Sequence, residues 1–247
     1  MVNSHKILIV LVVFISSILL SCVAESAKIY ANTKKLDFGI VNLGDSKELE
    51  FELRNKSNTP VSITRLSIVG SSNYDYTIAE SLPFTLYPDL YMNITARFTP
   101  NVITLASADF KLFNNFTSNP VIVELTGSGK EVPRISVSTA SLEFKEVVIN
   151  QTETHDVEIE NTGTLDLQIS ALNFTGIDAA LFTISSGGTT PISIIPGAKH
   201  TIEITFLPVS DGNFTANLEI EHDAVNETSP QIIKLSGESL TLTRKLP

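Results

Sequence analysis

The hydrophobic pattern along the chain predicts β-strands almost everywhere beyond residue 30. From Lys47 to Arg54, three apolar side chains alternate with three glutamates, and this period of two is typical of an antiparallel strand with one buried face. No stretch keeps the period of about 3.6 residues that an amphipathic helix requires. Further strands are predicted at residues 61–68, 74–78, 91–98, 106–112 and 121–125, and at 167–174, 181–184, 199–206, 214–220 and 231–235.

This strand pattern occurs twice in the chain. The segment from Leu36 to Gly39 leads to a turn centred on Asn55, and the segment beginning at Leu142 leads in the same way to Asn161, displaced by 106 positions. The strand that follows slips in phase near Thr64 in the first copy and at the same place in the second. A slip shared by both copies predicts a β-bulge in each.

The closing motifs of the two copies also correspond. Each copy has a strand ending in Phe-x-Pro and a last strand ending in Leu-x-Gly, namely Phe98-Thr99-Pro100 with Leu125-Thr126-Gly127, and Phe206-Leu207-Pro208 with Leu235-Ser236-Gly237. In this order the repeat resembles the ASPM/SPD-2/hydin (ASH) family, known in bacterial surface proteins as the choice-of-anchor D domain. The resemblance implies two tandem immunoglobulin-like β-sandwich domains used for interaction, without a shared catalytic site. Copy 1 departs from the family pattern at Asp89, where copy 2 has Gly197.

The pattern and the resemblance together give an expected domain organisation. A signal segment is expected at 1–22, a tether at 23–30, the first sandwich at 31–130, the second at 131–238 and a tail at 239–247. The glycine-rich stretch from Gly127 to Pro133 is expected to link the two sandwiches. Its Gly-Ser-Gly-Lys sequence lacks the earlier glycine and the following helix of a phosphate-binding loop.

The first 22 residues predict export. Lys6 precedes fourteen apolar or small residues, which end at Leu20 and are followed by Ser21 and Cys22; this is the arrangement of a secretory signal. The end of the segment resembles a bacterial lipobox, which implies that Cys22 carries a lipid that anchors the protein to a membrane, although Leu20 replaces the usual small residue. The alternatives are an ordinary signal cut just after Cys22, and an uncleaved anchor, for which the run is shorter than the roughly 20 residues of a span. The expected location is the cell envelope, at the outer membrane or cell surface rather than the cytoplasmic membrane.

Composition excludes several kinds of chemistry. Cys22 is the one cysteine and there is no tryptophan, so an internal disulfide and the Cys–Trp–Cys core of antibody domains are both ruled out. His155 and His200 begin strands that pair antiparallel in an immunoglobulin-like sandwich, which places them at opposite ends and argues against a shared metal site. No nucleophile motif stands on a strand-to-helix turn. We therefore expect no catalytic residues, no metal and no cofactor; a carboxylate-based enzyme is the least supported hypothesis.

Charge and tyrosine are distributed unevenly between the copies. Residues 31–130 have a net charge of −1 and residues 131–237 a net charge of −11, which argues against nucleic acid as a partner. All five tyrosines lie in the first half. Tyr76 aligns with Phe182 and is assigned to the core. Tyr74, Tyr87 and Tyr91 have no aromatic counterpart, and we expect them to contact a partner, because tyrosine is enriched at interfaces.

The sequence therefore predicts a non-catalytic lipoprotein of the cell envelope, acting as a structural or adhesive protein-interaction module. Its expected partners are the membrane, through the N-terminal lipid, and a protein or surface ligand whose identity the sequence does not give. The alternative is a periplasmic assembly or chaperone-like component that binds a strand at an open sheet edge.

Overall fold

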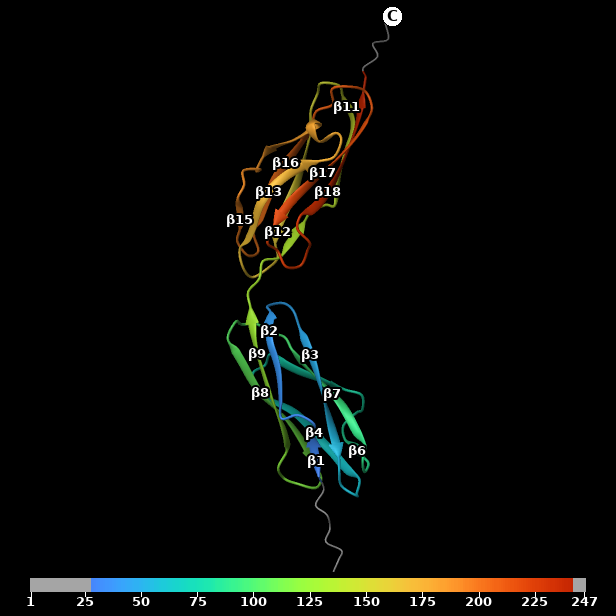
Figure 1. The fold of residues 1–247 in the computed structure, drawn as a ribbon, viewed down its shortest axis with the longest axis vertical. Helices are drawn as coiled ribbons and strands as arrows, with labels where there is room; N and C mark the ends of the chain where they lie inside the picture. The colour runs from blue at the N-terminus through green and yellow to red at the C-terminus, as the bar shows by residue number, and fades with distance from the viewer. Residues whose placement is uncertain (1–27, 242–247) are drawn as a thin grey trace, which may run out of the picture. The chain divides into compact units, whose positions relative to one another are not determined.

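The structure of the protein is a computed structural model that describes residues 28–241 (Figure 1). The expected signal segment, Cys22 and most of the expected tether and tail lie outside the described residues. The chain divides into two compact units between Gly129 and Lys130, called domain 1 and domain 2 below. Each is built of two β-sheets, which confirms the predicted all-β fold of two tandem sandwiches.

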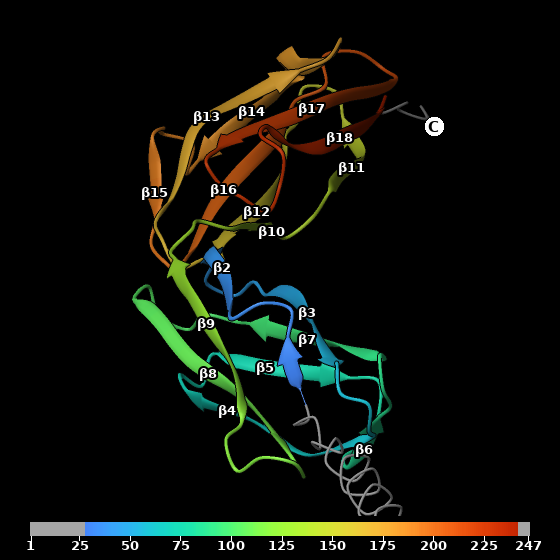
Figure 2. The same ribbon diagram turned by 60° about the horizontal axis from the view of Figure 1, so that its bottom comes forward.

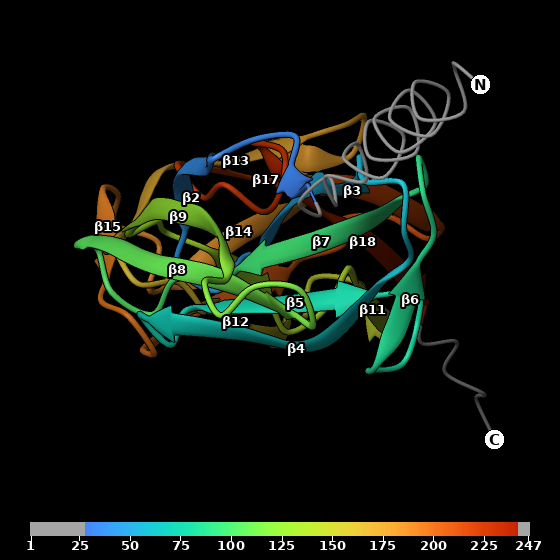
Figure 3. The ribbon, with the colours of Figure 1, turned by 90° about the horizontal axis from the view of Figure 1, so that it is seen from below.

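Domain 1 consists of a four-stranded and a five-stranded sheet. In the first, the spatial order is β1 (Ile29–Ala31), β3 (Lys47–Asn55), β7 (Tyr91–Phe98) and β5 (Tyr74–Ile78). In the second, it is β2 (Lys35–Asn42), β9 (Val121–Lys130), β8 (Leu105–Asn114), β4 (Val61–Gly70) and β6 (Phe84–Leu86). Figure 2 shows β8 between β9 and β4, and Figure 3 shows β5 and β7 side by side.

Domain 2 repeats this arrangement strand for strand. Its four-stranded sheet has the order β10 (Ile135–Val137), β12 (Glu153–Asn161), β16 (Lys199–Phe206) and β14 (Phe182–Ser186). Its five-stranded sheet has the order β11 (Ser141–Val148), β18 (Gln231–Leu240), β17 (Asn213–His222), β13 (Leu167–Thr175) and β15 (Ile192–Ile194). Among residues 28–241, the one helical turn is η1 (Ala179–Leu181).

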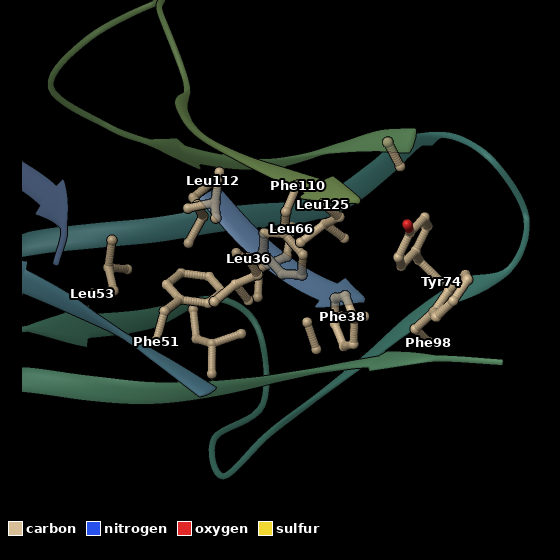
Figure 4. Packing of buried hydrophobic residues seen from close by; sticks show 14 of the residues in the cluster. Leu36, Phe38, Phe51, Leu53, Leu66, Tyr74, Phe98, Phe110, Leu112 and Leu125 are labelled. Carbon is tan, nitrogen blue, oxygen red and sulfur yellow. The ribbon is translucent and has the colours of Figure 1, made fainter. Parts of the chain in front are cut away.

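Each domain has its own hydrophobic core between its two sheets. In domain 1 the ring of Phe38 on β2 lies 5.6 Å from that of Phe98 on β7, and Phe51 meets Phe110 edge-on at 5.4 Å (Figure 4). Phe51 and its neighbour Leu53 are buried, as the period-two pattern of residues 47–54 predicted. Both expected bulges are present, since the pairing shifts register after Ile63 in β4 and after Ile169 in β13.

Several boundaries differ from those expected. Residues 127–130, expected in a linker, form the end of β9, where Ser128 pairs with Leu105 of β8. Glycine is present here because of packing rather than flexibility: a Cβ atom on Gly127 would lie 2.6 Å from Cε1 of Phe98. Strand β1 begins at Ile29, inside the range expected as a tether, and β18 ends at Leu240, inside the range expected as a tail.

Candidate interaction surface

Two of the three proposed contact tyrosines are exposed at one turn of domain 1. Tyr87 and Tyr91 flank the turn between β6 and β7, and their side chains are 57% and 54% exposed. The backbone N–H of Leu90 donates to the Tyr87 carbonyl at 3.1 Å, which closes the turn. Leu90 is itself 54% exposed, so three large side chains face solvent within five residues.

Strand pairing extends this surface across the four-stranded sheet. Tyr30 on β1 lies opposite Arg54 on β3, and Arg54 lies opposite Tyr91 on β7. The Arg54 guanidinium carbon lies 5.0 Å from the centre of the Tyr91 ring, a cation–π distance. Arg54 Nε also donates to Glu52 Oε2 at 2.7 Å, and this bond raises the pKa of the guanidinium. The Arg54 side chain is therefore held in place by its contacts with Tyr91 and Glu52.

Tyr74, the third proposed contact residue, is a core residue instead. Its side chain is 7% exposed, its ring stacks on Phe98 with the centres 4.8 Å apart, and its hydroxyl donates to the Ala106 carbonyl at 2.9 Å (Figure 4). Burial raises the pKa of Tyr74 to about 12. The position cannot meet a partner unless the sandwich opens.

The error over Tyr74 comes from a shift of two residues in the comparison of the copies. Phe182, and not Ala180, is the counterpart of Tyr74: it lies opposite Phe206 and stacks on it at 4.9 Å, just as Tyr74 lies opposite Phe98. The two additional residues of domain 2 fall in the η1 turn before Phe182, so the displacement of 106 positions no longer holds from Phe182 onward. Tyr76 is half-buried and meets Phe110 edge-on at 5.1 Å, so it does pack against the core.

The asparagine that marks each copy has a structural role. Asn161 is fully buried; its Nδ2 donates to the carbonyls of Leu165 and Ile194 at 2.8 and 2.7 Å, and its Oδ1 accepts from the Gly163 N–H at 2.9 Å. In domain 1 the Asn55 side chain makes equivalent bonds to Thr59, Leu86 and Ser57. The side chain thus joins the end of one strand, the turn after it and the short edge strand of the opposite sheet.

The departure at Asp89 does not disturb this arrangement. Asp89 has a φ of 60° and Gly197 a φ of 76°, so both adopt the left-handed conformation that glycine takes most readily and aspartate tolerates. The N–H of Asp89 donates to the Asn55 carbonyl at 2.9 Å, as that of Gly197 does to Asn161 at 2.8 Å.

The histidines make local contacts. His155 Nε2 lies 2.6 Å from Glu153 Oε1, and His200 Nε2 lies 2.7 Å from the Gly187 carbonyl. Within residues 28–241, no group of three or more His, Cys, Asp or Glu side chains is placed to hold a metal ion. The same part of the chain contains no helix long and apolar enough to cross a membrane.

Residues 26–130 and 132–239 each match the family model described as Cep192 domain 4. The chain belongs to this family. Its two Cep192 domain 4 units agree with the ASH part of the resemblance. A solved ASH/PapD-like domain of human CEP192 is similar to part of this chain: it is 21% identical over 45% of this chain and 89% of that one, with a TM-score of 0.34. No curated protein matches the chain.

Two other solved structures match both Cep192 domain 4 units. A protein of unknown function from Porphyromonas gingivalis W83 is 13% identical over 85% of this chain and 99% of its own, with a TM-score of 0.37. The periplasmic chaperone SfaE is 12% identical over 86% of this chain and 100% of its own, with a TM-score of 0.31.

Sequence reasoning missed three members of the surface, namely Leu90 beside the turn and Tyr30 and Arg54 on the neighbouring strands. Tyr30 and Arg54 join Tyr91 through the pairing of β1, β3 and β7. The outward phase of Arg54 is readable from the alternation of β3, but which residues lie opposite it depends on strand register, which the sequence leaves open.

Proposed function

We propose that the protein is a non-catalytic, lipid-anchored component of the cell envelope that uses domain 1 to contact another protein or a surface ligand. The observation that carries this proposal is the surface formed by four exposed residues and the half-buried Arg54. The exposed residues are Tyr30, Tyr87, Leu90 and Tyr91. Tyrosine and arginine are the residue types that most often dominate binding energy at protein interfaces. A preformed Arg–Tyr contact also reduces the side-chain entropy lost on binding.

Domain 2 has the same strands without this surface. The residues in the positions of Tyr30, Arg54 and Tyr91 are Ser136, Glu160 and Lys199, which pair across β10, β12 and β16. This domain also has most of the negative charge. Its contribution is to solubility and spacing, and its charge disfavours nucleic acid as a partner.

The anchoring part of the proposal rests on the sequence. Cys22 is the single cysteine of the chain and follows the apolar run that ends at Leu20, with Ser21 between them. A lipid on Cys22 would hold the domains at a membrane, with the outer membrane or cell surface as the proposed location.

The contact is tested by a double substitution with a matched control. Tyr87→Ser with Tyr91→Ser should abolish recovery of the partner from envelope extracts, because both rings are lost from the surface. The control is Ile195→Ser with Lys199→Ser at the equivalent turn of domain 2, where Ile195 is 62% exposed; it should leave recovery unchanged. Circular dichroism checks that both variants fold. If the partner is lost instead when Glu219, Glu221 and Asp223 are neutralised, domain 2 is the binding domain and the assignment is wrong.

A further inference from the structure

Strand β1 of domain 1 has a free edge. Among the strands of residues 28–241, it pairs with β3 alone. Two backbone bonds fix which residues take part: the Lys56 N–H donates to the Lys28 carbonyl and the Asn32 N–H to the Glu52 carbonyl, both at 2.9 Å. Since peptide groups alternate in direction along a strand, those of Ile29 and Ala31 face away from β3. In the part of the chain that the structure describes, no group bonds them.

The same edge in domain 2 is closed by a side chain. Strand β10 corresponds to β1, and its Ile135 is bonded on the outer side by Asn226. The Ile135 N–H donates to Asn226 Oδ1 at 2.9 Å, and Asn226 Nδ2 donates to the Ile135 carbonyl at 2.8 Å. A carboxamide presents a donor and an acceptor as a peptide unit does. The edge in domain 2 therefore already binds a peptide-like group.

Loop length explains why domain 1 lacks this closure. The loops begin alike, because Asn115 Oδ1 accepts from the Ser62 N–H and Asp223 Oδ1 from the Gln168 N–H, each at 2.9 Å. They end alike before Pro120 and Pro230, but residues 116–119 are two fewer than residues 224–229. The shorter loop folds back on itself, with two of its N–H groups donating to Asn114 Oδ1.

The free edge of β1 borders a groove that has apolar side chains and a lysine in its lining. The groove has a volume of about 260 Å³. It is lined by the three residues of β1, by Thr33 and Lys34, and by Val121 and Ile122 at the start of β9. Ile122 is 46% exposed. The Glu124 N–H donates to the Lys34 carbonyl at 2.8 Å, so by the same alternation the peptide groups of Ile122 face the groove. Figure 1 shows β1 and the connection into β9 at the same end of domain 1.

We propose that the free edge of β1 takes an extended peptide, which adds as a strand and bonds the outer peptide groups of Ile29 and Ala31. Its apolar side chains lie against the groove, and its carboxylates lie near the amino groups of Lys28 and Lys34. The inference rests on the proposed function of domain 1 as the contact domain, and names the class of its partner. Tyr30 joins the two features, because it stands on β1 and belongs to the exposed tyrosine row.

A proline substitution tests the edge without removing the β1–β3 bonds. Ala31→Pro deletes the N–H that faces the groove, while the bonds of Lys28 and Asn32 to β3 remain. The matched control is Val137→Pro at the same position of β10. The probe is a fluorescein-labelled heptapeptide with valine at its third and fifth positions, glutamate at its second and sixth, and serine or threonine elsewhere.

We expect saturable binding of this probe to the protein with both domains intact. The affinity should fall at least tenfold in Ala31→Pro and stay unchanged in Val137→Pro. Replacing the two glutamates of the probe by lysine should also weaken binding, because Lys28 and Lys34 would then repel it. Absence of saturable binding up to about 1 mM, or equal loss in both proline variants, would overturn the inference.

Exchange of the loops gives a second test that involves no proline. Putting residues 224–229 in place of residues 116–119 supplies domain 1 with the asparagine that closes β10, and should reduce probe binding as Ala31→Pro does. If this variant binds the probe as tightly as the unchanged protein, the edge of β1 is not the binding site.

Recovery of the envelope partner distinguishes the edge inference from the proposed function. If Tyr87→Ser with Tyr91→Ser releases the partner and Ala31→Pro does not, the edge inference fails and the proposed function stands. If neither variant releases it, both fail.

Discussion

Gly237 lies so close to the ring of Phe206 that a Cβ atom on it would overlap Cε1 at 2.5 Å. Gly127 has the same relationship to Phe98 in domain 1. The two closing motifs of the repeat, Phe-x-Pro and Leu-x-Gly, therefore meet across the sandwich, the phenylalanine from the four-stranded sheet and the glycine from the five-stranded one. In each domain, the two motifs together let one phenylalanine ring pack directly against the backbone of a glycine.

Gly237→Ala should therefore destabilise domain 2 by about 1–3 kcal/mol, the usual cost of overpacking a core. Urea unfolding of the chain measures it. In a Phe206→Leu background the added methyl group should cost less, since the smaller side chain leaves room. If the destabilisation of the double variant equals the sum of the two single substitutions, the Phe206 ring is not the reason why glycine is required at position 237.

Asn161→Ala should destabilise domain 2 by about 2–5 kcal/mol. The substitution leaves the Leu165 and Ile194 carbonyls and the Gly163 N–H without their partner, and each buried polar group left unpaired costs about 1–3 kcal/mol. Asn173→Ala, at an exposed position of β13, serves as the control and should change stability little. Similar losses in the two variants would contradict the role assigned to Asn161.

The strands, the repeat and the two bulges were predictable because each leaves a periodic mark on the sequence. The role of Tyr74 was not, because the η1 turn has no such mark. Two inserted residues between Gly176 and Phe182 can be placed at several points of a loop without altering any hydrophobic pattern. The strand pairing and ring stacking of Tyr74 with Phe98, and of Phe182 with Phe206, fix the correct correspondence.

For the candidate surfaces, the sequence could predict the exposure of single residues but not the contacts between residues that are far apart in the chain. Exposure of Tyr87 and Tyr91 follows from their position beside a turn. The row that they form with Arg54, and the bond between Asn226 and Ile135, join segments far apart in the chain. Ninety-one positions separate Ile135 from Asn226, so their contact depends on the tertiary fold and on the length of one loop.

His222 should make domain 2 less stable in mild acid. The side chain is buried, and burial lowers its pKa from the ordinary value of 6.5, outweighing the opposite effect of Asp223 and Glu227. Its Nδ1 accepts from the Ala224 N–H at 3.2 Å, which also favours the neutral ring. The unfolded chain therefore binds a proton more readily than the folded one, and stability falls as the pH drops below about 6.5.

The matched variant for this pH effect is His222→Asn, because asparagine is the residue at the equivalent position of domain 1. There Asn114 Oδ1 accepts from the Phe116 N–H at 2.9 Å, so the acceptor is retained while the titrating group is removed. Peptide-resolved hydrogen exchange at pH 7.5 and pH 5 should show a smaller loss of protection in domain 2 of the variant. An unchanged loss would assign the pH dependence to the carboxylates.

Cys22→Ser should release the protein from membranes. A covalent acyl chain contributes about 0.8 kcal/mol for each buried CH₂ group, and the serine variant cannot carry one. Fractionation of envelope preparations with and without detergent is the measurement. If the variant remains in the membrane fraction until detergent is added, the apolar run before Cys22 is an uncleaved span and the lipid anchor is the wrong hypothesis.

The placement of the tyrosines has a practical consequence for every measurement on the intact chain. All five belong to domain 1 and the chain has no tryptophan, so its intrinsic fluorescence reports domain 1 alone. Tyr74, enclosed beside Phe98 with its hydroxyl bonded to a carbonyl, gives that signal a component that changes when the sandwich opens. Domain 2 has neither tyrosine nor tryptophan and so does not contribute to this emission. The unfolding of one domain can thus be followed in the presence of the other without a label, and a titration that quenches this emission identifies the domain that holds the ligand.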